Sequence, residues 1–249
     1  MIRRVSAPGF YPQEPTALKS LINALLSQVE KYSFSSGIVP HAGYTYSGLA
    51  AASFYKSMKK TNSVIILGND HYGNALTPST HPYQVWETPL GKVNVDDDLS
   101  DSLDLPVVES FREHSIEVQL PFLQSVLKDF SILPITVPPT PLEKLLALGD
   151  ELKALNVPII ATSDLSHYLP RNSASRLDSI AIEAILGGDP RELERVVSDH
   201  KISMCGLHPV LLAMYTLRKK DRELIMYYTS GDVSGDTNSV VGYTSIGFE

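Results

Sequence analysis

The sequence has a single cysteine, Cys205, and a single tryptophan among its 249 residues. One cysteine excludes an intrachain disulfide and a zinc site of the CxxC type. No apolar run approaches the ~20 residues that span a bilayer. The start at Met1 leads into prolines rather than into the apolar segment of a signal peptide. We therefore expect a cytoplasmic protein without membrane insertion.

Positive charge is also scarce. Lysine and arginine number 21 against 28 aspartates and glutamates, which gives a formal net charge of -7. The longest basic run is Arg218-Lys219-Lys220, so we expect no nucleic-acid partner. The content of 43% hydrophobic and 20% charged residues is typical of globular proteins. We expect one α/β domain over residues 1–249.

Apolar, β-branched runs alternate with segments of helical spacing, a pattern that predicts a largely parallel sheet with covering helices. The predicted strands are 37–39, 63–68, 130–137, 157–162, 224–229 and 240–248. The predicted helices are 16–31, 49–56, 113–127 (kinked or restarted at Pro121), 142–155, 176–186, 191–197 and 210–217. The stretch 72–104 is predicted to be irregular with one hairpin at most, and 230–239 to be a polar, mobile loop.

Three of these strands are each followed by a histidine: His41, His71 and His167. The helical segments between the strands make them parallel neighbours, so their carboxyl ends converge on one crevice. In open α/β sheets, ligands bind in such a crevice.

Cys205 lies just before a predicted helix, where amide donors and the helix dipole favour a thiolate. Imidazoles with a thiolate suit iron, zinc or copper, whereas magnesium and calcium prefer oxygen ligands. In this interpretation His41, His71 and Cys205 bind the ion. His167 is then an acid–base group, and Asp164 orients an imidazole.

Two alternatives remain open on the residues alone. In a metal-free hydrolase, Cys205 would be the nucleophile, activated by His167 and Asp164. That interpretation leaves His41 and His71 unexplained. In the other alternative, Cys205 is a buried apolar residue and the histidines only cap helices.

Candidates for the pocket wall are four aromatic residues and two further histidines: Phe10, Tyr11, Tyr44, Tyr46, His114 and His208. Core packing is the alternative for each aromatic residue. His114 and Glu117 are three residues apart on a predicted helix, so they either anchor that helix or line the pocket. His81 and His200 have polar neighbours and are predicted to be solvated surface residues.

Five segments resemble, in order, the motifs of the Memo family, which is named for a mediator of cell motility. They are Pro40-His41-Ala42-Gly43-Tyr44-Thr45-Tyr46-Ser47-Gly48, Gly68-Asn69-Asp70-His71, Glu113-His114-Ser115-Ile116-Glu117-Val118-Gln119-Leu120-Pro121, Ser163-Asp164-Leu165-Ser166-His167 and Cys205-Gly206-Leu207-His208-Pro209. The family is similar to the class III extradiol dioxygenases, which are non-haem iron enzymes. The resemblance implies a three-layer α/β/α domain with a central, mostly parallel or mixed sheet.

The resemblance also implies roles for site residues. His41 and His71 match the two histidines of the family's metal site, and Cys205 matches the cysteine that stands where the dioxygenases have a carboxylate. His167 occupies the place of the dioxygenase acid–base histidine, with Asp164 beside it. The implied cofactor is iron, with copper or zinc as alternatives.

Three departures bear on the function. Phe10 stands where the family has a tryptophan, and Asn69-Asp70-His71 replaces Pro-Ser-His, which places the Asp70 carboxylate beside a ligand. The thiolate in place of a carboxylate softens the site, and fold does not imply function. We expect a metal-binding protein that performs redox chemistry on a small molecule or handles the metal itself. The alternative is a module that binds a short peptide or protein without turnover.

Overall fold

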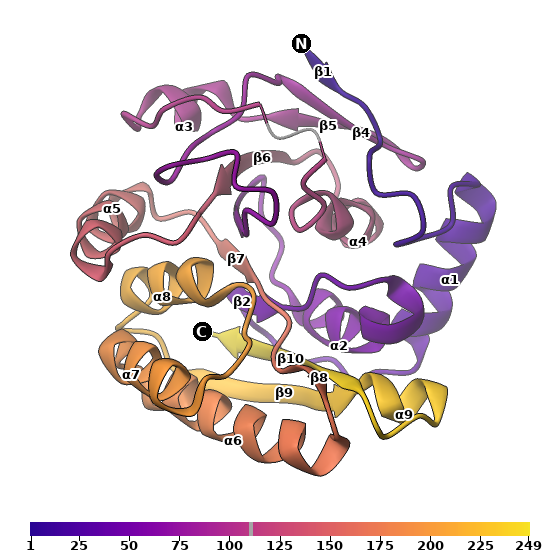
Figure 1. The fold of residues 1–249 in the computed structure, drawn as a ribbon. Helices are drawn as coiled ribbons and strands as arrows, with labels where there is room; N and C mark the ends of the chain where they lie inside the picture. Colours follow the sequence, from indigo (N-terminus) through magenta and orange to yellow (C-terminus); the bar gives the residue numbers. More distant parts are fainter. Residues whose placement is uncertain (110–111) are drawn as a thin grey trace.

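Buried apolar runs form the central strands of one mixed sheet in the computed structural model, which describes residues 1–109 and 112–249 (Figure 1). In β3 (Ser63–Gly68), the four residues Val64, Ile65, Ile66 and Leu67 are fully buried. A strand buried on both faces reads as a continuous apolar run, which is why the sequence pattern identified it.

The other elements follow in chain order. The strands are β1 (Ile2–Arg3), β2 (Ser36–Val39), β4 (Val85–Thr88), β5 (Gly91–Val95), β6 (Ser131–Thr136), β7 (Ile159–Thr162), β8 (His167–Leu169), β9 (Arg222–Thr229) and β10 (Val240–Phe248). The helices are α1 (Pro15–Ser27), α2 (Tyr44–Ser57), α3 (Asp97–Asp101), the 3-10 turn η1 (Glu117–Gln119), α4 (Leu120–Val126), α5 (Leu142–Leu155), α6 (Arg171–Gly187), α7 (Pro190–His200), α8 (Leu207–Thr216) and α9 (Ser230–Ser234).

The described strands have the order β1-β4-β5-β6-β3-β7-β2-β10-β8, and β9 pairs with β10. Strands β6, β3, β7 and β2 are mutually parallel, whereas β10 runs antiparallel to β2, β8 and β9. In the register, Val39 lies opposite Thr162, and Leu67 lies opposite Ala161. The three neighbours β2, β7 and β3 therefore end at the same edge of the sheet.

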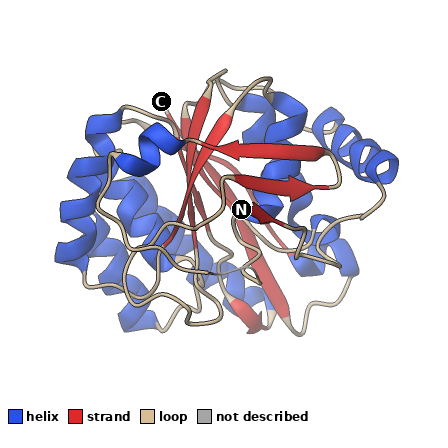
Figure 2. Ribbon diagram, turned by 90° about the horizontal axis from the view of Figure 1, so that it is seen from above, coloured by secondary structure: helices blue, strands red, loops and turns tan. Residues whose placement is uncertain are grey.

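Helices cover both faces of this sheet, as Figure 2 shows from above. One apolar core joins α5, α6, α7 and α8 to one face, and the other joins α1, α2 and α4 to the opposite face. Neighbouring residues of a strand divide between them: Ile65 packs in the first core and Ile66 in the second. This alternation follows from the two-residue period of a strand. The molecule is a single α/β domain of three layers, as the sequence predicted.

Helix α2 begins at Tyr44, five residues before the predicted start, with Gly43 as its N-cap. Gly48, which lies just outside the predicted helix, is an interior residue of α2. A Cβ atom there would lie 2.7 Å from a methyl carbon of Leu25 on α1, so glycine at this position lets the two helices approach closely.

The predicted helix from residue 113 is wrong at its start. Glu113 accepts backbone hydrogen bonds from His71 (2.8 Å) and Ser115 (2.9 Å), a local pattern that competes with helix formation. The helical part begins at Glu117. The helix restarts as α4 at Leu120, which confirms the predicted restart rather than a kink, because Pro121 lies in the first turn, where no N–H donor is needed.

Two segments predicted to be irregular contain regular structure. Residues 72–104 hold the expected hairpin of β4 and β5, and also α3. The stretch 230–239 begins with α9, whose start is fixed by reciprocal hydrogen bonds between Thr229 and Asp232. In the described part of the chain, no helix has both the length and the apolar content needed to cross a bilayer.

Candidate metal centre

Two neighbouring strand ends and the segment before η1 bring three histidines together. His41 follows β2 and His71 follows β3, and their ring centroids are 5.1 Å apart with perpendicular planes. The ring of His114, from the segment before η1, stacks on His71 with centroids 4.6 Å apart and lies 5.6 Å from His41. His114 therefore lines the crevice, one of the two alternatives left open by the sequence.

Cys205 completes the group from the turn before α8. Its Sγ lies 3.1 Å from Nε2 of His41, and candidate ligand atoms of His41, His71 and Cys205 all lie within 4.8 Å of one another. The turn is anchored on the end of β7, because the backbone N–H of Gly206 donates to Oγ of Ser163 at 3.0 Å. Two imidazoles and one thiol thus converge, as the metal interpretation requires.

The two imidazoles are held through their Nδ1 atoms. His71 Nδ1 lies 2.9 Å from a carboxylate oxygen of Glu113, and His41 Nδ1 lies 3.1 Å from Oγ1 of Thr162. Metal-binding histidines characteristically use one ring nitrogen in this way, which fixes the ring and leaves the other nitrogen for the ion. In both residues Nε2 is left as the candidate ligand atom.

Burial dominates the electrostatics of the centre. It lowers the pKa of His41 well below its ordinary value, with further lowering by His114 and His71, and it lowers the pKa of His114 to about 4. Burial also acts to lower the pKa of His71, but the hydrogen bond and charge of Glu113 raise it on balance. At neutral pH His41 and His114 are therefore uncharged, the form in which imidazole binds a metal.

Burial and the neighbouring Asp164 carboxylate raise the pKa of Cys205 to about 12. The expected thiolate is therefore absent in the metal-free protein at neutral pH. Burial raises the pKa of Asp164 itself to about 6. A bound cation would reverse this balance, because it favours the deprotonated form of the sulfur.

Asp164 and His167 lie beside the sulfur but are not hydrogen-bonded to each other within the described residues. Asp164 accepts the backbone N–H of His41 at 3.0 Å, so it positions that backbone rather than an imidazole. His167 Nδ1 lies 2.9 Å from the carbonyl oxygen of Ser203. The catalytic roles predicted for Asp164 and His167 remain predictions. The contacts do not form the Cys-His-Asp chain that a hydrolase would use.

Phe10 borders the centre from the amino-terminal segment. Its ring centroid lies 4.1 Å from that of His114. Both residues line a cavity of about 520 Å³ that opens beside the histidines, and its remaining lining consists of Val5, Ser6, Pro8, Tyr72 and Arg112. A ligand in this cavity would contact the His114 ring, which stacks on His71.

The other predicted pocket residues lie elsewhere. Tyr11 and Tyr44 are buried, and their hydroxyls donate to Glu117 (2.7 Å) and to the carbonyl of Val118 (2.6 Å). Tyr46 is exposed in the first turn of α2. Tyr11 and Tyr44 thus serve packing, the alternative that the sequence left open.

Asp70 is buried and accepts the backbone N–H of Ala75 at 2.7 Å, so it holds the loop after His71. His208 lies in the first turn of α8, with no hydrogen bond or ring contact to the centre among the described residues. The prediction for His81 is wrong, because it is buried with Nε2 3.1 Å from Oγ1 of Thr136. His200 is exposed, as predicted.

Sequence reasoning missed Glu113 and Thr162 as the residues that hold the rings of His71 and His41. Glu113 stands directly before His114 in a motif that was otherwise noted, and this position beside a histidine was the available signal. Thr162 is the last residue of β7, and only the register with β2 places its hydroxyl beside His41.

Tyr168, directly after His167, has a left-handed backbone with φ of 58° and is 79% exposed. This conformation costs a non-glycine residue about 1–2 kcal/mol, and strained residues cluster at functional sites. We expect Tyr168→Gly to raise the free energy of unfolding by up to about 1 kcal/mol in urea titrations. Lys201→Gly, at φ of 52° in the C-cap of α7, is the matched control. If Tyr168→Gly destabilised the protein and Lys201→Gly did not, the packing of the Tyr168 ring would outweigh the backbone strain.

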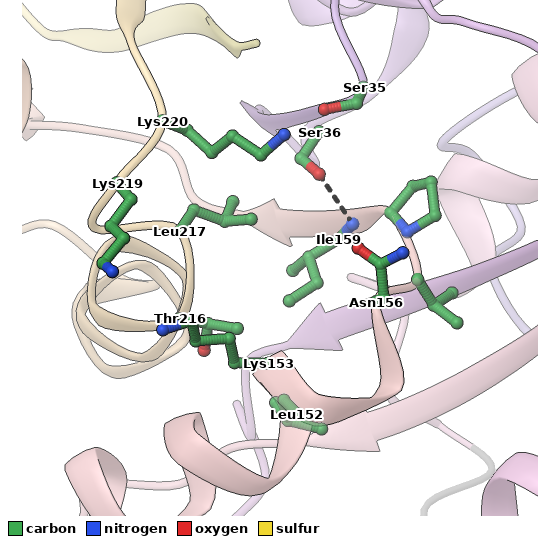
Figure 3. A pocket seen from close by; sticks show the side chains of 12 residues that line it. Ser35, Ser36, Leu152, Lys153, Asn156, Ile159, Thr216, Leu217, Lys219 and Lys220 are labelled. Carbon is green, nitrogen blue, oxygen red and sulfur yellow. Dashed lines mark hydrogen bonds between the residues drawn. The ribbon is translucent and has the colours of Figure 1, made fainter.

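A second cavity, of about 240 Å³, lies at the amino ends of β2 and β7, opposite the histidines (Figure 3). Lys153, Lys219 and Lys220 line it, near the carboxyl ends of α5 and α8. Lysines at these positions compensate the negative ends of the helix dipoles. Its lining contains no histidine, cysteine or carboxylate, so it is a poor candidate for metal chemistry.

Residues 3–247 match the family model of Memo-like proteins. The chain belongs to the Memo family. Relatives named MEMO1 family protein include one from Nitrosopumilus maritimus, 36% identical over all of both chains, and one from Archaeoglobus fulgidus, 34% identical over 97% of each. Another, from Methanococcoides burtonii, is 38% identical over 96% of this chain and 97% of its own. The Memo motifs identified in the sequence include His41, His71, His114 and Cys205, which this Memo protein brings together in space.

Proposed function

We propose that this Memo protein binds a transition-metal ion through His41, His71 and Cys205, with iron as the first candidate. The protein uses this ion for redox chemistry on a small molecule. The observation that supports this most directly is the 3.1 Å approach of Cys205 Sγ to His41 Nε2. With His71 also in reach, the donor set of two imidazoles and one sulfur fits iron, copper or zinc.

The protein's own residues would do the following work. Thr162 and Glu113 hold the two imidazoles in the orientation for binding. Phe10 and His114 wall the adjoining cavity, where the substrate would lie against their rings. With three protein ligands, a bound ion would supply electron exchange and open positions for small ligands. His167, fixed at Nδ1, would exchange a proton through Nε2.

The alternative of a metal-free hydrolase is less consistent with the geometry. The raised pKa of Cys205, about 12, makes its thiol a weak nucleophile at neutral pH. A peptide-binding module would need the cavity but not the ligand set. Removal of metal therefore separates the two functions: it would abolish redox chemistry and leave peptide binding intact.

Nitric oxide tests the proposal, because it binds to an iron ion that has an open coordination position. Anaerobic protein loaded with iron(II) is treated with nitric oxide and examined by electron paramagnetic resonance. We expect a stoichiometric iron–nitrosyl signal, which is lost in His41→Ala and altered in Cys205→Ser. His200→Ala, at an exposed histidine far along α7, should behave as the wild type. A loaded wild type without any nitrosyl signal would argue for the binding module.

Glu113→Gln should weaken metal binding by about 10- to 100-fold, the usual effect of removing a carboxylate that holds a ligating histidine. The amide cannot supply the charge that now faces Nδ1 of His71 at 2.9 Å. Competition with a chelator of known affinity measures the change. An unchanged affinity in a folded Glu113→Gln protein would mean that His71 is not a ligand.

A further inference from the structure

Two candidate ligand groups meet at the sulfur of Cys205. Beside the group with His41 and His71, ligand atoms of Asp164, His167 and Cys205 also lie within 4.8 Å of one another. We propose that the crevice takes a second metal ion on Asp164 and His167, with the Cys205 sulfur bridging the two ions. This inference rests on the proposed metal centre and extends it.

The orientation of His167 matches that of the first two imidazoles. Its backbone N–H donates to Oγ of Ser203 at 2.8 Å, and its Nδ1 lies 2.9 Å from the carbonyl oxygen of the same residue. A carbonyl oxygen accepts only, so Nδ1 carries the proton and Nε2 has the free lone pair. The ring is therefore fixed in the tautomer that binds a metal through Nε2.

Asp164 supplies the charge for a second ion. The residue is 5% exposed, and among the described residues no lysine or arginine forms an ion pair with its carboxylate. A buried carboxylate is costly unless a cation accompanies it. A divalent ion between Asp164 and His167 provides that cation. Binding releases the thiol proton of Cys205 to solvent, and the resulting thiolate has lone pairs for both ions.

The neighbouring group of His71, Glu113 and His114 is a poorer second position, although its ligand atoms are equally close. His71 would have to serve both ions, but its Nδ1 is committed to Glu113 at 2.9 Å. An imidazole with one free nitrogen cannot bridge two ions, whereas a thiolate can. The second ion therefore belongs on the side of Asp164.

The proposal also gives His167 two states. With one ion bound, its Nε2 remains free to exchange protons with a ligand. With two ions bound, the same nitrogen is a metal ligand and proton exchange through it is lost.

Cobalt(II) is the probe, because its visible bands and its sulfur-to-metal charge-transfer band report separately on geometry and on thiolate binding. Anaerobic wild-type protein is titrated with cobalt(II), and the bound metal is counted after equilibrium dialysis. We expect two ions per chain, with the second shifting the charge-transfer band produced by the first. This spectral shift is measured on the wild-type protein. It therefore tests for the second ion even if a variant fails to fold.

Three variants locate the second ion. His167→Gln should bind one ion instead of two, while His114→Gln and the distant His200→Gln should bind two. One ion in the wild type, two in folded His167→Gln, or loss of the second ion in His114→Gln alone would each overturn this inference but leave the first centre intact. No bound ion in the wild type would overturn the metal centre itself, so the two failures are distinguishable.

Discussion

Replacing Glu117 with alanine should lower the free energy of unfolding by about 3–5 kcal/mol, because it removes the carboxylate that balances the charge of the buried Arg3 guanidinium. The side chains of Arg3 and Glu117 form an ion pair and are both completely buried. Glu117 also accepts the hydroxyl of Tyr11 at 2.7 Å and the backbone N–H of Ala7 at 2.9 Å. One carboxylate therefore ties the amino-terminal segment to the helical segment that follows His114.

Urea unfolding followed by the fluorescence of Trp86 measures this effect, since the Arg3 guanidinium lies 4.1 Å from the centroid of that ring. Removing both charges, as in Arg3→Met with Glu117→Leu, should recover the part of the loss that comes from the unbalanced charge, but not the part from the donors of Tyr11 and Ala7, which still lack an acceptor. A loss below about 1 kcal/mol in Glu117→Ala, the usual limit for an exposed pair, would show that this pair is solvated.

Gly206→Ala should both destabilise the protein and weaken metal binding. A Cβ atom at Gly206 would lie 2.1 Å from the carbonyl oxygen of Thr162 and 2.7 Å from Cβ of Ser163. Neither atom can move away from the added methyl group unless the end of β7 moves as well. We therefore expect a loss of about 1–3 kcal/mol in the free energy of unfolding. The displaced turn carries Cys205, so the sulfur moves away from His41.

Gly187→Ala is the matched control, because a Cβ atom there meets nothing within 4 Å in the described part of the chain. At this last residue of α6, alanine should be neutral or slightly stabilising. Calorimetry and a metal titration on both variants make the comparison. Equal stability and equal metal affinity in the two variants would contradict the role assigned to the Gly206 contact.

The sequence predicted the sheet and the convergence of His41 and His71, because buried strands carry a strong local pattern and parallel strands end at one edge. It did not predict the start of the helical segment after His114. That boundary depends on Glu113, whose hydrogen bonds run to His71, 42 residues earlier. Contacts at such separation leave no periodic signal in the chain.

Tertiary contacts also explain two wrong predictions about the site, for Cys205 and His81. The helix dipole predicted a thiolate at Cys205, but burial and Asp164 act in the opposite direction and prevail in the metal-free protein. The polar neighbours of His81 predicted exposure. Yet the segment around it folds onto β6, where Thr136 approaches the ring. Local sequence reports propensity, whereas burial is decided by tertiary packing.

The most direct test of the metal centre is elemental analysis of protein purified without oxygen and loaded with iron(II). The account predicts at least one tightly held ion per chain in the wild type and in His200→Ala, and little or none in His41→Ala. Equal metal content in His41→Ala and the wild type, or no tightly held metal in any of the three, would contradict it.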